Sequence, residues 1–200
     1  MGRRSVVWLL GALIAAAPLA AQGRLSKEDA DRFQSKLTKI VALGNEPLRK
    51  SSQPRNTPLS DAEVNSYLKY RAADQIPTGI VDPMLSALGS GRVSGRAVVD
   101  LDAVRTQKKR GWLDPLGYLT GRLPVTASGV LTTKDGKGQF QLQSAEISGV
   151  TVPKSVLQEL LSYYSKSPEN PEGINMDAPF ELPAKIREIR VGTGTSTVVQ

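Results

Sequence analysis

The side chains that could carry chemistry are few, because this 200-residue chain has neither histidine nor cysteine. Their absence excludes Ser-His and Cys-His nucleophile pairs and an ordinary zinc site. Ser66 and Lys69 match the serine-lysine spacing of penicillin-binding enzymes, but the chain has no Lys-Thr-Gly partner. Tyr67 and Leu68, between them, belong to the apolar stripe of an expected helix. We therefore predict no catalytic residues and keep a Ser66/Lys69 hydrolase as the enzymatic alternative.

Two other motifs also lack the residues that their chemistry needs. The run GSGRVSG at 89–95 has no preceding predicted strand and no closing Lys-Ser/Thr, so we do not interpret it as a phosphate loop. Asp100 and Asp102 alternate along a predicted strand and could share a cation. The further ligands of a calcium loop are missing, which favours a solvated polar face. We predict neither a metal nor a cofactor.

Residues 1–21 have the pattern of a secretory signal peptide. Arg3 and Arg4 precede an uncharged apolar run from Val6 to Leu19, and small residues lead to a cleavage site after Ala21. An uncleaved anchor is the alternative, but the run is shorter than the roughly 20 residues of a membrane span. We therefore expect a soluble periplasmic or secreted protein.

The formal net charge is +7, and it falls to +5 when the two arginines of the signal peptide are removed. A basic exported protein is expected to meet phospholipid or lipopolysaccharide head groups rather than nucleic acid.

Apolar residues at helical spacing predict a first helix over 26–43, capped by Ser26. Three prolines indicate an exposed linker at 44–58, and a Ser60/Glu63 capping box starts a second helix. Residues 78–91 suggest irregular chain with a helical turn around Met84 to Leu88. We thus expect an N-terminal helix and linker over 22–59 and an α+β domain over 60–200.

From Arg92 the apolar period changes to two, which indicates half-buried strands over 92–104 and 122–133. The turn KDGKG at 134–138 leads to a returning strand with Phe140 and Leu142 inside, so we predict a hairpin. We expect a third helix with Pro153 in its first turn, and one or two final strands around Ile186, Ile189 and Val191. The fold class is α+β, with a long curved antiparallel sheet packed on amphipathic helices in a single domain.

Four small residues stand on the inner faces of these strands, where larger apolar residues are usual: Gly95, Ala97, Ala127 and Gly129. They allow another group to approach the sheet closely. One explanation is that the helix at 156–164 crosses over them, as in a filled core. The other is a groove that admits an acyl chain.

A basic cluster, Lys108, Lys109 and Arg110, directly precedes Trp112. It is either a solvated connection above a satellite of the core or a contact with a membrane interface, where cations meet phosphates and aromatic rings lie at head-group depth. Each such cation contributes about 1 kcal/mol near an anionic leaflet, so the contact would be transient.

The order of elements resembles that of small exported bacterial envelope proteins. The phrases EVNSYLKY, GRVSGRAVVDLDAV, GVLTTKDGKGQFQLQSAEISGVTVP and LPAKIREIRVGTGTSTV, between Ser60 and Val199, are similar in layout to the tubular lipid-binding superfamily and to AsmA-like repeats. The resemblance implies a strongly curved antiparallel sheet wrapped on a helix, with a hydrophobic groove for lipid tails and no catalytic residues.

Our leading hypothesis is a periplasmic protein that binds a lipid or another apolar envelope molecule and touches an anionic membrane surface through Lys108, Lys109, Arg110 and Trp112. The predicted groove residues are Val93, Ala97, Val99, Leu123, Val125, Leu157 and Leu161. The alternative is a non-enzymatic scaffold or accessory protein of the envelope with a filled core. The sequence leaves the ligand and the oligomeric state open.

Overall fold

The computed structural model describes residues 24–47, 53–107, 120–166 and 170–200. The predicted signal peptide and the predicted membrane contacts Lys108, Lys109, Arg110 and Trp112 lie outside the described residues. Within the described segments, no helix is long and apolar enough to cross a membrane.

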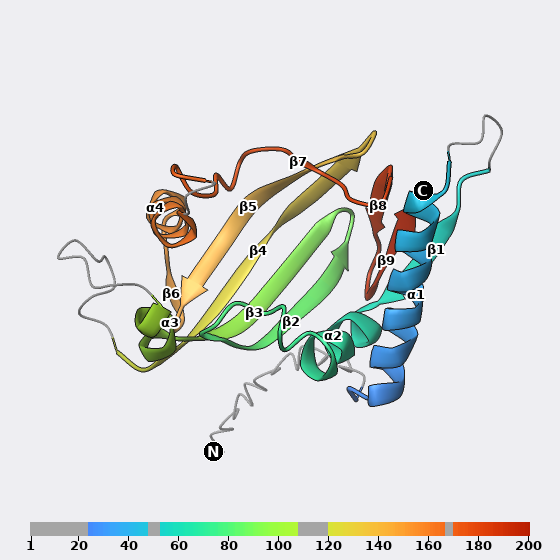
Figure 1. Ribbon diagram of the computed structural model, residues 1–200. Helices are drawn as coiled ribbons and strands as arrows, with labels where there is room; N and C mark the ends of the chain where they lie inside the picture. The colour runs from blue at the N-terminus through green and yellow to red at the C-terminus, as the bar shows by residue number, and fades with distance from the viewer. Residues whose placement is uncertain (1–23, 48–52, 108–119, 167–169) are drawn as a thin grey trace, which may run out of the picture.

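Two capped helices form one end of the molecule (Figure 1). Helix α1 (Lys27–Asn45) begins after Ser26, whose Oγ accepts the Asp29 N–H, and α2 (Asp61–Tyr70) begins with the predicted Ser60/Glu63 capping box. Both predictions are confirmed. The helices pack against each other, with the Phe33 and Tyr67 ring centroids 4.8 Å apart.

A three-stranded antiparallel sheet packs beside α1, in the order β1-β9-β8. Its strands are β1 (Asn56–Ser60), β8 (Glu188–Val191) and β9 (Thr195–Val199). The buried hydrophobic cluster lies here and consists of Ile40, Leu182, Ile186 and Val198. The predicted linker at 44–58 is therefore wrong at its end, because residues 56–58 pair with β9. Local sequence did not reveal a partner more than 130 residues away.

The large sheet is antiparallel throughout and has the order β2-β3-β4-β5-β6, with β7 also paired to β5. Its strands are β2 (Ile80–Gly89), β3 (Arg92–Asp100), β4 (Arg122–Lys134), β5 (Lys137–Ile147), β6 (Val150–Thr151) and β7 (Phe180–Glu181). The predicted β4–β5 hairpin is confirmed. Its turn residues Asp135 and Gly136 both have positive φ, 49° and 82°, as a two-residue type I′ turn requires.

Strand β2 corrects the prediction of irregular chain and a helical turn at 78–91. Asp82 and Pro83 have the composition of a turn, but they form an irregularity inside the strand, where Asp82 has φ 47° and the register shifts between Val81 and Met84. The run at 89–95 consequently does follow a strand, and it forms the β2–β3 turn and the start of β3.

The predicted strand over 92–104 ends earlier, at Asp100. There the Asp100 carboxylate accepts the Ala103 N–H at 3.0 Å and starts α3 (Leu101–Gln107). Leu101, which was expected on the strand, is 2% exposed in this helix. Asp100 and Asp102 therefore do not share a strand face.

The predicted third helix is present as α4 (Lys154–Ser165), with Pro153 at its N-cap and not in its first turn, and it lies beside β5 at the far end of the large sheet (Figure 1). Its main contact with the sheet is with β5. The predicted α+β class with an antiparallel sheet is thus confirmed, with the difference that the strands divide into two sheets.

Candidate functional site

The large sheet has one apolar face, which the strand register assembles. Ala97 stands opposite Val125, Val99 opposite Leu123, and Val93 opposite Gly129. Residues directly opposite each other in a sheet project from the same face. The five predicted groove residues on β3 and β4 therefore lie together on one surface, which we call the apolar wall.

Neighbouring strands extend the apolar wall beyond the predicted residues. Leu85 is paired with Gly95, and Leu131 with Phe140. Phe180 of β7 lies over Gly138 of β5. Leu85 and Phe180 were missed. Leu85 stands between Met84 and Ser86 in a stretch without a clear period of two, and the Asp82-Pro83 pair before it has the composition of a turn. Phe180 lies in a two-residue strand that has no periodicity.

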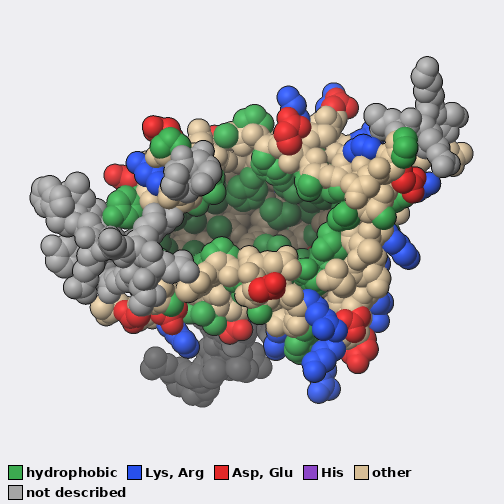
Figure 2. All heavy atoms as spheres, in the orientation of Figure 1, with side chains coloured by type: hydrophobic (Ala, Val, Ile, Leu, Met, Phe, Trp, Pro, Cys, Tyr) green, Lys and Arg blue, Asp and Glu red, His purple; other side chains and the backbone are tan. Residues whose placement is uncertain are grey.

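The apolar wall is open. Figure 2 shows the face above the large sheet hollowed and lined mostly by hydrophobic side chains. The wall residues Val93, Val99, Leu123, Val125 and Leu131 are all half-buried, although β3 and β4 are central strands. Leu85 is 49% exposed, whereas Ile40 in the core cluster is 4% exposed. Protein atoms of the described residues therefore do not fill this hollow.

The helix expected over the small residues does not lie there. Leu157 and Leu161 are half-buried on α4, which borders the wall beyond β5. At Gly95, a Cβ would meet only the Leu85 side chain, at 3.4 Å, and the Met84 carbonyl oxygen, at 3.8 Å. Most of the small-residue patch thus contributes to the width of the hollow.

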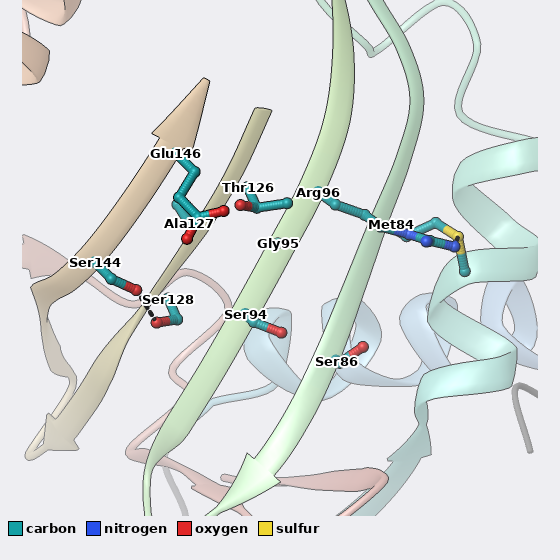
Figure 3. Close-up of a pocket in the computed structure, with 10 residues that line it drawn as sticks. All are labelled: Met84, Ser86, Ser94, Gly95, Arg96, Thr126, Ala127, Ser128, Ser144 and Glu146. Carbon is teal, nitrogen blue, oxygen red and sulfur yellow. Dashed lines mark hydrogen bonds between the residues drawn. The ribbon is translucent and has the colours of Figure 1, made fainter. Parts of the chain in front are cut away.

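The opposite face of the same strands is polar (Figure 3). Four serines stand in register across β2, β3, β4 and β5: Ser86, Ser94, Ser128 and Ser144. They line a shallow cavity of about 350 Å³ together with Arg96, Thr126 and Glu146. The hydroxyls of Ser128 and Ser144 are 2.7 Å apart. The sheet therefore separates a hydroxyl-rich face from the apolar wall.

Ser66, the nucleophile of the alternative Ser66/Lys69 hydrolase, is not accessible. This side chain is completely buried, and its Oγ accepts the Ser26 N–H at 3.1 Å. Ser66 thus joins α2 to the start of α1.

Asp100 and Asp102 have structural partners. The Ala103 N–H and the Arg122 guanidinium, whose Nε lies 3.0 Å from Asp100 Oδ2, lower the pKa of Asp100. Asp102 accepts the Gly121 N–H at 3.2 Å. In the part of the chain that the structure describes, no three acidic residues gather in a metal-binding arrangement.

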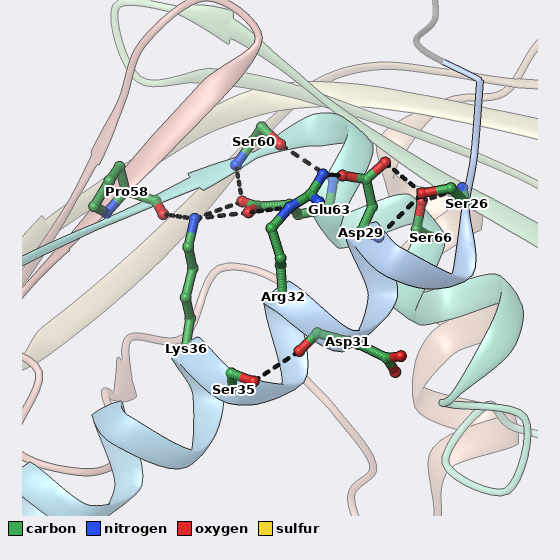
Figure 4. Close-up of polar contacts among 10 residues, drawn as sticks. All are labelled: Ser26, Asp29, Asp31, Arg32, Ser35, Lys36, Pro58, Ser60, Glu63 and Ser66. Carbon is green, nitrogen blue, oxygen red and sulfur yellow. Dashed lines mark hydrogen bonds and ion pairs between the residues drawn. The ribbon is translucent and has the colours of Figure 1, made fainter.

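A charged network holds α1 against α2 (Figure 4). Glu63 is 6% exposed, and its two carboxylate oxygens lie 2.7 and 2.8 Å from Lys36 Nζ. Burial raises the pKa of Glu63, but the hydrogen bonds from Lys36 and from the Ser60 N–H outweigh burial and leave this pKa below its usual value. The network joins α1 to α2 and has a structural role.

Comparisons with known proteins give little beyond this geometry. No protein-family model matches the chain, and no curated protein matches it. One similar solved structure is described as the crystal structure of lipopolysaccharide binding protein, with 15% identity and a TM-score of 0.23. The match covers 78% of this chain but 45% of that protein. A TM-score this low supports no conclusion about fold or function.

Proposed function

We propose that the protein binds a lipid or another apolar molecule of the cell envelope on the apolar wall. The observation that carries this proposal is the open hollow over the central strands of the large sheet. Apolar surface left in water costs about 25 cal/mol per Å², and extended apolar patches on soluble proteins commonly mark binding sites. An apolar ligand in the hollow would remove that cost.

The dimensions of the wall suit a long hydrocarbon chain. From Leu123 to Leu131, β4 runs for roughly 27 Å at about 3.4 Å per residue. This length exceeds the roughly 15 Å depth of one hydrocarbon leaflet, half of a bilayer core of about 30 Å. An extended acyl chain would therefore lie along the strands with its full length against apolar side chains.

The cellular setting belongs to the same proposal and is supported by sequence patterns. The N-terminal signal pattern favours a periplasmic or secreted protein. The cluster of Lys108, Lys109, Arg110 and Trp112 favours transient contact with an anionic membrane surface. Ligand binding is also favoured over an envelope scaffold with a filled core, because α4 packs beside β5 and not over β3 and β4.

Native mass spectrometry of protein purified from cells without detergent, followed by lipid extraction, tests the proposal. We expect a bound apolar mass in the wild type. Ala127→Trp should fill the hollow and lower the occupancy at least about tenfold, which corresponds to about 1.4 kcal/mol of binding energy. Thr126→Trp is the matched control, because its side chain faces the polar side, and it should retain the ligand. A ligand-free mass in the wild type, together with no binding to anionic vesicles at low salt, would refute the proposal.

A further inference from the structure

Two phenylalanine rings lie at one end of the apolar wall, each over a glycine. A Cβ at Gly129 would stand 2.5 Å from Phe140 Cζ, and a Cβ at Gly138 would stand 2.6 Å from Phe180 Cζ. Such distances leave no room for a side chain, so each ring occupies the space above its glycine. Both glycines are buried as a result. Phe140 and Gly138 lie two residues apart on β5, close to the β4–β5 turn.

These rings are not part of a closed core. Phe180 is 45% exposed and Phe140 is half-buried. The chain has only three phenylalanines, and the third, Phe33, packs against Tyr67 between α1 and α2. The other end of the wall is aliphatic and contains Val99, Leu123 and Val125. The hollow therefore has an aromatic end and an aliphatic end.

We infer that the aromatic end is a subsite for a planar part of the ligand, such as a ring system or a conjugated chain. This inference rests on the proposed function, and it narrows the ligand from any apolar molecule to one with a flat unsaturated portion. A planar ligand group that packs on a phenylalanine ring in an offset or tilted arrangement gains binding energy beyond that of the apolar area it buries. A saturated chain gains only the energy of burying apolar area, and a leucine side chain would provide that energy equally well.

The glycines give the subsite its shape. With any larger residue at 129 or 138, the rings would be displaced into the hollow. Gly129 is constrained further, because a Cβ there would also stand 2.4 Å from the Gln141 carbonyl oxygen. The two glycines thus allow the rings to lie close to the sheet. This placement leaves the hollow wider at this end.

Binding of two probes to lipid-free protein tests the inference. The planar conjugated probe is diphenylhexatriene, followed by its fluorescence, and the saturated probe is palmitate, followed by calorimetry. Phe140→Leu and Phe180→Leu should each weaken diphenylhexatriene binding about five- to tenfold, which corresponds to about 1 to 1.4 kcal/mol, and should leave palmitate binding within about twofold. Phe180→Trp keeps a planar face and should restore the binding of the conjugated probe. Thermal unfolding verifies that each variant is folded.

Equal losses for the two probes, or no loss for either, would overturn the planar subsite. Loss of diphenylhexatriene binding in Phe180→Trp as well would overturn it too. Wild-type protein that binds palmitate but not diphenylhexatriene refutes the subsite alone. Wild-type protein that binds neither probe refutes the proposed function with it.

Discussion

Deletion of the same side chain at two positions separates an open wall from a filled core. Leu85 on the wall is 49% exposed, whereas Leu182 in the core cluster is 9% exposed. Complete burial of a leucine side chain contributes about 1.5 to 3 kcal/mol. Leu85→Ala in lipid-free protein should therefore lower the free energy of unfolding by about 1 kcal/mol. No cavity cost is added, because the hollow already exists.

Leu182→Ala should lower the free energy of unfolding by about 3 kcal/mol, since a core deletion adds the cost of a new cavity. Urea unfolding measures both variants. With a slope of about 2 kcal/mol per molar urea, the midpoints should fall by about 0.5 M and about 1.5 M. The hydrogen bonds between Asn65 and the Leu85 main chain are kept in Leu85→Ala, so the comparison reports on the side chain.

Saturating palmitate adds a second arm to this experiment. A ligand at 100 times its Kd stabilises the folded state by about 2.7 kcal/mol. That gain should be smaller in Leu85→Ala and unchanged in a Leu182→Ala protein that remains folded. If the two deletions cost the same in lipid-free protein, Leu85 is covered and the open wall is refuted.

Two further predictions concern the framework around the wall. Glu63→Gln should lower the free energy of unfolding by about 2 kcal/mol, because it leaves Lys36 without its buried partner. Calorimetry measures this variant beside Glu28→Gln, a control at an exposed position. Equal stabilities of the two variants would contradict the prediction. The folded-state pKa of Glu63 is lowered, so its carboxylate contributes to the free energy of unfolding above the usual glutamate pKa. This contribution is lost as the pH falls through the folded-state pKa. The difference in stability between wild type and Glu63→Gln should therefore vanish in acid. Asn65→Ala should expose the Leu85 main chain at the sheet edge and cause concentration-dependent association of the protein. Sedimentation measures this association. A variant that stays monomeric at high concentration would show that the edge is protected by other means.

The edge of β2 explains how this sheet keeps its place without a helix across its face. The Asn65 amide donates to the Leu85 carbonyl at 2.8 Å and accepts the Leu85 N–H at 2.7 Å. The Asp61 carboxylate accepts the Ala87 N–H at 3.0 Å. Burial raises the pKa of Asp61, and the Ala87 N–H opposes that rise. Side chains of α2 thus satisfy the outward groups of the edge strand and leave the apolar wall free.

Local sequence determined the elements whose signals lie within a few neighbouring residues. The Ser26 and Ser60 caps fixed the starts of α1 and α2, and the Asp135-Gly136 turn fixed the β4–β5 hairpin. Alternation of apolar residues placed Val93, Ala97, Val99, Leu123 and Val125 on one face. These features follow from backbone geometry and hydrogen bonding over short range, so the chain reveals them without its fold.

Tertiary structure alone decided which apolar surfaces are covered. The pairing of β1 with β9 and the packing of Ile40 on Val198 join distant parts of the chain and form the core away from the large sheet. Helix α4 has an apolar stripe that fits a crossing position equally well, yet it lies beside β5. A periodic pattern states that a face is apolar, but whether protein or a ligand covers that face depends on contacts between residues far apart in sequence.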